Sequence, residues 1–327
     1  MERLLTGLRA AGEPTRLRLL TLCAHAELSV SELVQILGQS QPRISRHLKL
    51  LVEAGLLERH REGVSVFYRI DASGPSAALA RTLVDLVPAD DPEPARDLAR
   101  LEQVRARRAE AAAAYFEEVA DEWDRLRRLH VPETEVEARL REVVGPAPIG
   151  SFLDVGTGTG RILELLADQV ERGVGIDSSA AMLRVARARL EAMELRHLQV
   201  RLGDMYALAV DDVSVDLATL HLVLHYADEP AEALAEAART LRPGGRLVVV
   251  DFAPHDEEHL RDEHRHRHLG FEDAAVEGAF FRAGLEPGPV ERLAGNPLTV
   301  NIWSARKPSA DRSPTLADEP RPDAARP

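Results

Sequence analysis

The sequence predicts an α/β protein of two domains: a small, mainly helical domain with one strand pair, followed by a mostly parallel sheet flanked by helices. Three observations lead to this prediction. The 327 residues are many for a single hydrophobic core. Residues 28–70 have the pattern of two short helices and a hairpin. From Ser151 onward, apolar segments of strand length alternate with helical patterns, which is the order of a parallel sheet.

Composition indicates a protein of the reducing cytoplasm. Apolar residues make up 45% of the chain and charged residues 29%, as in ordinary globular proteins. The single cysteine, Cys23, excludes an internal disulfide framework. Residues 1–16 lack the apolar core of a signal peptide, and no apolar run is long enough to span a bilayer. We therefore expect a cytoplasmic protein that does not enter a membrane.

Charge is distributed unevenly between the two predicted domains. Residues 1–70 carry ten Lys and Arg against seven Asp and Glu, a net charge of +3, whereas the whole chain has a net charge of −13. A basic N-terminal part followed by an acidic remainder indicates that the N-terminal part, and not the remainder, binds a polyanion.

Five segments are expected along the chain. The first domain covers residues 1–87, and the Pro- and acid-rich segment 88–94 is predicted to be a linker. Residues 95–150 are predicted to form a helical connector, with Tyr115, Phe116 and Trp123 in a lid over a pocket. The second domain covers residues 151–306, and residues 307–327, which lack apolar anchors, are predicted to be a disordered tail.

The first domain contains a helix–turn–helix pattern with a basic hairpin. The helices are expected at residues 31–37 and 41–53, and the hairpin at residues 57–70 turns near Glu62 and Gly63. Ile44, Leu48 and Leu51 form an inward stripe on the second helix. Polar and basic side chains on its other faces and on the hairpin are suited to contact base edges and phosphates. The candidate DNA-binding residues are Ser40, Gln41, Arg43, Ser45, Arg46, His47, Lys49, Arg59 and Arg61.

The stretch Gln39-Ser-Gln-Pro-Arg-Ile-Ser-Arg-His-Leu-Lys-Leu-Leu51 resembles the ArsR/SmtB family of winged helix-turn-helix repressors. The resemblance covers about residues 1–87. It implies a homodimer held by the first and last helices, near residues 2–11 and 75–87, that binds a palindromic double-stranded DNA operator. The alternative is an unrelated small domain in which a solvated amphipathic helix lies beside a hairpin.

One departure from that family concerns metal sensing. Members that sense arsenite or cadmium have two cysteines where this chain has Ser29 and Ser31, and serine hydroxyls do not replace soft thiolate ligands. Residues 75–87 also lack the His and Asp pairs that bind zinc elsewhere in the family. We therefore expect no metal sensing at either position, and expect Cys23 to be a small buried residue.

The second domain opens with a glycine-rich turn after its first strand. Gly156, Gly158 and Gly160 let the backbone turn tightly and approach a ligand. Asp177 ends the next strand, at the spacing at which a carboxylate meets ribose hydroxyls. This pattern alone is shared with dinucleotide-dependent dehydrogenases, which remain the alternative at this point.

Further motifs separate these readings. Asp154 precedes the Gly-x-Gly-x-Gly turn, Leu202-Gly-Asp-Met205 follows the third strand, and Leu241-Arg-Pro-Gly-Gly leads into the fifth. Together with Val223–Pro230, they resemble the class I S-adenosylmethionine (SAM) methyltransferases that modify small molecules. The resemblance covers about residues 110–306 and implies a Rossmann-like, mostly parallel sheet with an antiparallel final strand.

The resemblance also implies residue roles. Asp154, Gly156, Gly158 and Gly160 would hold the methionine end of SAM, and Asp177 the ribose. Residues around the adenine and the sulfonium complete the expected cofactor site: Ser178, Met182, Asp204, Met205 and His221. Met182 could equally be a core residue.

Methyl transfer needs a general base only if the acceptor must lose a proton. The candidates near the pocket mouth are His221, His225, Tyr226 and Tyr115, with a purely structural role as the alternative for His225. The histidine-rich segment 255–268 is expected to be a solvated helix or a substrate-side insertion; a zinc site through its i, i+4 histidine pairs is the alternative.

The sequence disfavours two classes of methyl acceptor and leaves the identity of the acceptor open. The segment 219–225 lacks the motif of amino-methylating DNA enzymes, and arsenite methylation requires several thiolates. Two functions remain: an active small-molecule methyltransferase that is also a repressor, or a repressor whose inactive methyltransferase fold senses SAM or S-adenosylhomocysteine. A metalloid sensor is a third, weaker hypothesis.

Overall fold

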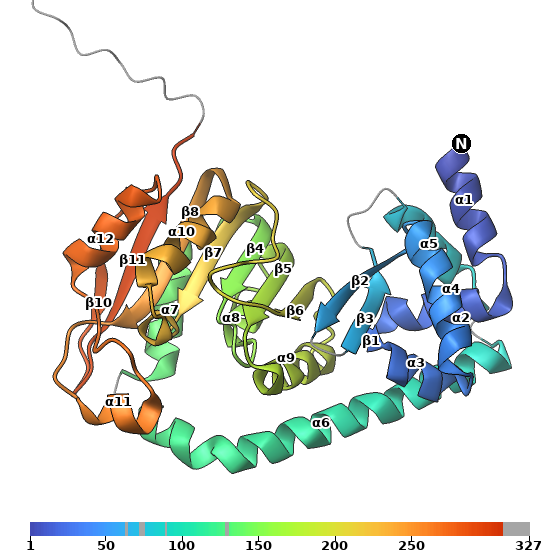
Figure 1. Cartoon of the computed structure of the whole chain (residues 1–327), viewed down its shortest axis with the longest axis horizontal. Helices are drawn as coiled ribbons and strands as arrows, with labels where there is room; N and C mark the ends of the chain where they lie inside the picture. The colour runs from blue at the N-terminus through green and yellow to red at the C-terminus, as the bar shows by residue number, and fades with distance from the viewer. Residues whose placement is uncertain (63–64, 72–75, 89, 128–130, 310–327) are drawn as a thin grey trace, which may run out of the picture.

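The computed structural model describes residues 1–309 except 63–64, 72–75, 89 and 128–130, and leaves out the side chains of 112–113, 115–127 and 262–263. Two domains lie side by side, and the long helix α6 (Pro92–Arg127) runs along both (Figure 1). None of the helices in the described ranges is both long and apolar enough to cross a membrane.

The first domain is a winged helix-turn-helix, as predicted. Its helices are α1 (Glu2–Ala11), α2 (Pro14–His25), α3 (Val30–Leu37), α4 (Gln41–Glu53) and α5 (Ala77–Asp85). Its strands are β1 (Leu28–Ser29), β2 (Leu57–Glu62) and β3 (Ser65–Ile70). β3 lies between β1 and β2 and pairs antiparallel with both. The recognition helix α4 has the predicted bounds, and its predicted stripe of Ile44, Leu48 and Leu51 is buried.

Ser29, at one of the two positions where metal-sensing relatives carry cysteine, starts a helix. Its hydroxyl accepts from the backbone N–H of Glu32, and the Glu32 carboxylate accepts from the backbone N–H of Ser29 at 2.8 Å, which is a capping box. The helix ends at Gly38 in the left-handed conformation. Cys23 is buried in the core of this domain, and burial raises the pKa of its thiol.

The linker predicted at residues 88–94 is shorter in the structure, because α6 already begins at Pro92. The Asp91 carboxylate accepts from the backbone N–H of Glu93 at 3.0 Å, and proline is tolerated in a first helical turn. Leu101 and Val104 of α6 are buried in the core of the first domain. The first part of the predicted connector therefore belongs structurally to the first domain.

The second domain is a sheet with helices on both faces, which confirms the predicted fold class. The strands are β4 (Ile149–Val155), β5 (Val170–Asp177), β6 (Leu198–Leu202), β7 (Val215–His221), β8 (Leu241–Phe252), β9 (Glu286–Pro287), β10 (Glu291–Leu293) and β11 (Val300–Arg306). Their order is β10-β11-β8-β7-β4-β5-β6, with β9 paired to β11. The strands from β4 to β8 are parallel, and β9, β10 and β11 are antiparallel to their neighbours.

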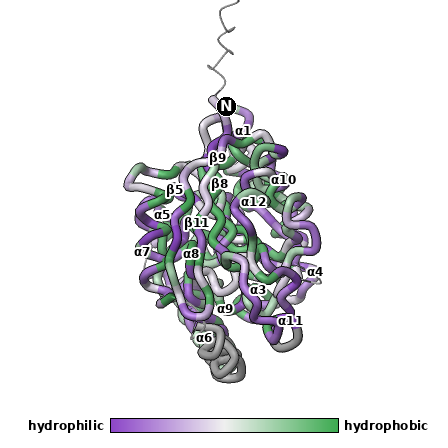
Figure 2. The backbone as a smooth tube through the Cα atoms, turned by 90° about the vertical axis from the view of Figure 1, so that its left-hand side faces the viewer, coloured by the Kyte–Doolittle hydropathy of each residue, from purple (hydrophilic) through white to green (hydrophobic). Residues whose placement is uncertain are grey.

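Helices cover this sheet and enclose an apolar interior. They are α7 (Glu133–Val144), α8 (Arg161–Leu165), α9 (Ala180–Ala192), α10 (Pro230–Thr240), α11 (His259–His264) and α12 (Asp273–Arg282), with a 3₁₀ turn η1 at Leu224–Tyr226. Phe152 and Leu153 are adjacent on β4 and are buried in different cores, one on each face of the sheet. Figure 2 shows apolar residues along β8 and β11 and polar residues on outer helices such as α7. Both faces are covered, so ligands are expected at the carboxyl ends of the strands.

Candidate active site

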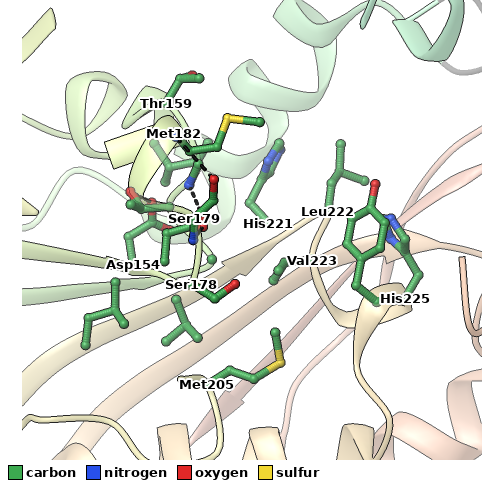
Figure 3. A pocket seen from close by; sticks show the side chains of 18 of the residues that line it. Asp154, Thr159, Ser178, Ser179, Met182, Met205, His221, Leu222, Val223 and His225 are labelled. Carbon is green, nitrogen blue, oxygen red and sulfur yellow. Dashed lines mark hydrogen bonds between the residues drawn. The ribbon is translucent and has the colours of Figure 1, made fainter. Parts of the chain in front are cut away.

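A cavity of about 830 Å³ opens at the carboxyl ends of β4, β5 and β7. The predicted site residues that line it are Asp154, Gly156, Gly158, Asp177, Ser178, Met182, Asp204, Met205, His221 and His225. Gly160 does not line it; it is the N-cap of α8, where a Cβ would lie 3.1 Å from Ala186. In Figure 3, Asp154, Ser178 and Met182 lie at one end and His225 at the other, with His221 between them.

The glycine-rich turn forms one wall of the cavity. The backbone N–H groups of Gly156 and Thr157 both donate to the carbonyl of Ile176, which joins the turn to β5. Gly158 has a φ of +53°, and a Cβ there would have no neighbour within 4 Å. The backbone at Gly158 is therefore open to a ligand.

Asp177 joins this turn to the start of α9. Its carboxylate accepts from the backbone N–H of Gly158 and from that of Ser179, each at 2.8 Å. Burial raises its pKa although these hydrogen bonds act in the opposite direction. A carboxylate has about four acceptor positions, so Asp177 can still accept from a hydroxyl of a ligand.

Asp154 links β4, β7 and the glycine-rich turn through buried hydrogen bonds. It is 1% exposed, and it accepts from the Thr157 hydroxyl at 2.7 Å and the Thr219 hydroxyl at 2.6 Å. Burial, opposed by these bonds and reinforced by the charge of Asp177, raises its pKa to about 6. Sequence reasoning missed both threonines, since their pairing with Asp154 depends on the fold.

Two methionines lie on either side of Ser178 (Figure 3). Met182 is in the first turn of α9, where its backbone N–H donates to the Ser179 hydroxyl. Met205 follows Asp204, whose carboxylate accepts from the backbone N–H of Tyr206 at 3.0 Å. Polarizable thioethers on both sides suit a flat heterocycle.

The opposite end of the cavity is formed by histidines. Nδ1 of His225 lies 2.8 Å from the carboxylate of Asp251, and both residues are buried. His266 and His264 also line this end. Of these residues the sequence singled out His225 as a candidate, but neither Asp251 nor His266. The candidate Tyr115, and Phe116 and Trp123 of the predicted lid, have side chains outside the described part of the structure.

The charge of the lining favours a cationic ligand. Six carboxylates line the cavity: Glu133, Glu137, Asp154, Asp177, Asp204 and Asp228. Three arginines do so: Arg161, Arg189 and Arg267. A ligand with an ammonium, a sulfonium, a ribose and a planar base matches these carboxylates, the open backbone at Gly158 and the two thioethers. The residues of the glycine-rich end therefore fit SAM.

The histidine-rich segment 255–268 does not have the geometry expected of a helical zinc site. α11 covers only His259–His264, so neither predicted i, i+4 pair lies within one helix. Among the residues that the structure describes, no group of three or more His, Cys, Asp or Glu side chains could hold a metal ion.

The candidate DNA-binding residues share one helix and one strand of the first domain. The exposed ones are Ser40, Gln41, Arg43, Arg46, Lys49, Arg59 and Arg61. Ser45 and His47 are partly buried, and Nδ1 of His47 lies 3.6 Å from the Glu13 carboxylate. Nζ of Lys49 lies 3.7 Å from the Glu53 carboxylate on the same helix.

Fold and site define a winged helix-turn-helix domain joined to a class I SAM-dependent methyltransferase domain. Comparison with known families agrees: residues 13–59 match the profile described as "Bacterial regulatory protein, arsR family", and residues 153–249 match "Methyltransferase domain". The chain thus contains an ArsR-type regulator domain and a methyltransferase domain. The two predicted resemblances, and SAM as the cofactor of the second domain, are confirmed.

Relatives match parts of the chain. A demethylmenaquinone methyltransferase of Renibacterium salmoninarum is 36% identical over 45% of this chain and 61% of its own length. An uncharacterised protein of transposon TN4556 of Streptomyces fradiae is 44% identical over 34% of this chain and 32% of its own length. The chain thus spans less than two thirds of the length of these curated relatives.

Solved structures resemble the chain over about half its length. The geranyl diphosphate C-methyltransferase of Streptomyces coelicolor has 17% identity and a TM-score of 0.49, and covers 54% of this chain and 76% of its own. A SAM-dependent methyltransferase of Aquifex aeolicus has 20% identity and a TM-score of 0.45, and covers 55% of this chain and 91% of its own.

Proposed function

We propose that this chain is a homodimeric, cytoplasmic repressor fused to a SAM-dependent methyltransferase that methylates a small-molecule acceptor. The observation that carries the enzymatic half is the two-ended cavity, because its glycine-rich end fits SAM and its histidine-rich end leaves room for a second molecule. Protein pockets for small ligands have volumes of roughly 300–1,000 Å³, and about 830 Å³ lies in the upper part of that range.

In this proposal the cofactor is held by the residues at the glycine-rich end. Asp154 and the backbone at Gly156 and Gly158 face its methionine end, and Asp177 accepts from the ribose. The adenine lies among four residues that line that end: Ser178, Met182, Asp204 and Met205. Gly160, which does not line the cavity, acts only by starting α8.

DNA binding is proposed for the exposed face of α4 and for β2. Arg43 and Arg46 project from the recognition helix, and Arg59 and Arg61 from the wing, where cations can reach phosphates. α1 exposes three leucines that a partner copy could cover: Leu4, Leu5 and Leu8. A dimer through α1 and α5 would place two α4 helices on a palindromic operator.

A second candidate function, an inactive methyltransferase fold that senses SAM or S-adenosylhomocysteine, is favoured by α9. Its first turn holds Met182 at the cavity, and Arg187 further along the same helix contacts Glu27 and Glu62 of the DNA-binding domain. A single helix, α9, therefore connects the proposed cofactor site with the DNA-binding domain.

Methyl transfer from labelled SAM into a small-molecule cell extract tests the first function. Labelled product supports the enzyme. No product, together with operator affinity that changes when SAM or S-adenosylhomocysteine is added, supports the sensor instead. If operator affinity does not change when arsenite or zinc is added, the metalloid-sensor hypothesis is excluded.

A further inference from the structure

His266 is a buried side chain with unused hydrogen-bonding capacity. It lines the cavity, is 3% exposed, and neither of its ring nitrogens has a hydrogen-bond partner among the described residues. Leaving such groups unpaired costs free energy, so buried ones usually have a partner. Burial, together with the neighbouring His225, lowers the pKa of His266 to about 3. Its ring is therefore neutral at pH 7 and can both donate and accept.

His225 lies directly against His266 and is held by Asp251. The two imidazole centroids are 4.1 Å apart, at an angle of 32°. Asp251 accepts from Nδ1 of His225 at 2.8 Å and from its backbone N–H at 3.1 Å. The Asp251 carboxylate thus sets the tautomer in which Nε2 is the acceptor. It also stabilises the imidazolium that forms when Nε2 takes up a proton.

The histidine end of the cavity is lined by aromatic rings and is poorly suited to anions. Phe252 stacks on His266 with their rings 16° from parallel, and the ring of Tyr226 lies 4.1 Å from that of His225. Arg267, which follows His266 and lines the cavity, is paired with Asp228. Among the described lining residues of this end, Arg267 is already neutralised by Asp228, so it offers little compensation for the charge of a carboxylate or phosphate on an acceptor.

We infer that this end is a subsite for an uncharged, planar hydroxyaromatic or enolic acceptor, that Nε2 of His225 takes its hydroxyl proton, and that His266 bonds a second polar group on it. The inference rests on the proposed methyltransferase function. Bound SAM supplies a methyl group whose carbon–sulfur bond breaks with the electron pair left on sulfur. The acceptor oxygen forms the new bond to that carbon, its proton moves to His225, and the imidazolium then releases the proton to water.

The binding half is tested on the full chain saturated with S-adenosylhomocysteine, by calorimetric titration of three naphthalenes. We expect 2,3-dihydroxynaphthalene to bind most tightly, 2-naphthol about tenfold more weakly for one lost hydrogen bond, and 2-naphthoate not to bind. H266F should lower the affinity for the diol to that for 2-naphthol. The matched control H259F, at a half-exposed histidine of α11 outside the lining, should change neither affinity.

The catalytic half is tested with SAM and 2,3-dihydroxynaphthalene, by mass spectrometry of the monomethyl ether. H225Q should lower kcat at least 100-fold, and D251N should lower kcat by a smaller factor. Both variants should keep the affinity for S-adenosylhomocysteine, which shows that they are folded.

The outcomes separate the inference from the function on which it rests. If S-adenosylhomocysteine binds but 2-naphthoate binds as well as the diol, or H266F leaves the diol unaffected, the subsite is overturned and the methyltransferase stands. If the diol binds and H225Q methylates it at the unaltered rate, the role of His225 is overturned. If S-adenosylhomocysteine does not bind, both the inference and the proposed function fall.

Discussion

Arg187 of α9 donates a hydrogen bond of 2.6 Å to Glu62 at the end of the wing strand β2. The same guanidinium donates to Glu27 at 3.0 Å and lies over the ring of Phe67, with Cζ 4.3 Å from its centroid. These three charged side chains are 8–11% exposed. An arginine of the methyltransferase domain therefore holds the wing of the DNA-binding domain in a nearly dry contact.

Replacing Arg187 should destabilise the chain far more than replacing an exposed arginine. R187M removes the guanidinium from two buried glutamates and leaves each with the His60 ring, 3.3–3.4 Å away, at a cost of roughly 3–5 kcal/mol. The matched control is R242Q, whose partner Asp216 lies 3.0 Å away in a pair more than a third exposed on both sides; exposed pairs contribute about 0–1 kcal/mol. Urea unfolding of the full chain measures both, and equal losses would contradict a dry interdomain contact.

Replacing Ser29 should destabilise the protein more than replacing Ser31, although the two serines lie two residues apart. Ser29 is buried and caps α3, whereas Ser31 is exposed. S29A removes the cap and should cost about 0.5–2 kcal/mol, while S31A should remain within roughly 0.5 kcal/mol. Thermal unfolding of the two variants makes the comparison. A neutral S29A would show that the capping box does not contribute to stability.

The fold was predictable where local chemistry decides it. The bounds of α4 follow from Ser40, Pro42 and the apolar stripe, all of which are visible in the sequence. The start of α6 was missed because prolines at 92 and 94 suggested a linker, although Asp91 and a first turn that tolerates proline permit a helix there. Leu101 and Val104 are buried in the core of the first domain because of tertiary packing, which the sequence pattern does not reveal.

The glycine-rich end of the site was predictable and the histidine end only in part. The motif positions from Asp154 to Met205 follow the order of the strands, and all but Gly160 line the cavity. Asp251 could have been noticed as a carboxylate within the apolar run of β8. The approach of His266 to His225, and of Arg187 to the wing, joins segments far apart in sequence, which periodicity does not reveal.

Gly158 should be needed for the cofactor and not for the fold. G158A puts a methyl group into open cavity space, whereas G284A adds one at a second left-handed glycine, also with no neighbour within 4 Å, away from the cavity. Both variants carry a similar backbone strain of about 1 kcal/mol. Only G158A should weaken S-adenosylhomocysteine binding, by tenfold or more, in calorimetric titration. Equal affinities in the two variants would exclude a ligand at this turn.

Cations of α4 and β2 should contribute to operator affinity through phosphates. R46Q and R59Q each remove an exposed positive charge and should lower the slope of log affinity against log salt by about one. R196Q, a matched arginine change in the loop between α9 and β6, should leave the slope unaltered. Fluorescence anisotropy with DNA from upstream of the gene provides the measurement. A slope unaffected by R46Q and R59Q would place the DNA elsewhere on the protein.

The stability of the protein should depend on pH through Asp154. Because burial raises its pKa to about 6 in the folded protein from the ordinary value of 3.8, the folded state binds the proton more tightly than the unfolded chain does. Between about pH 4 and 6 the free energy of unfolding should therefore fall as the pH rises, by up to about 3 kcal/mol, and this contribution should be constant above pH 6. D154N has no titrating group there, so the difference in unfolding free energy between the native chain and D154N cancels the contribution of carboxylates that do not interact with Asp154. A difference that stays constant from pH 4 to 7 would show that this buried carboxylate keeps an ordinary pKa.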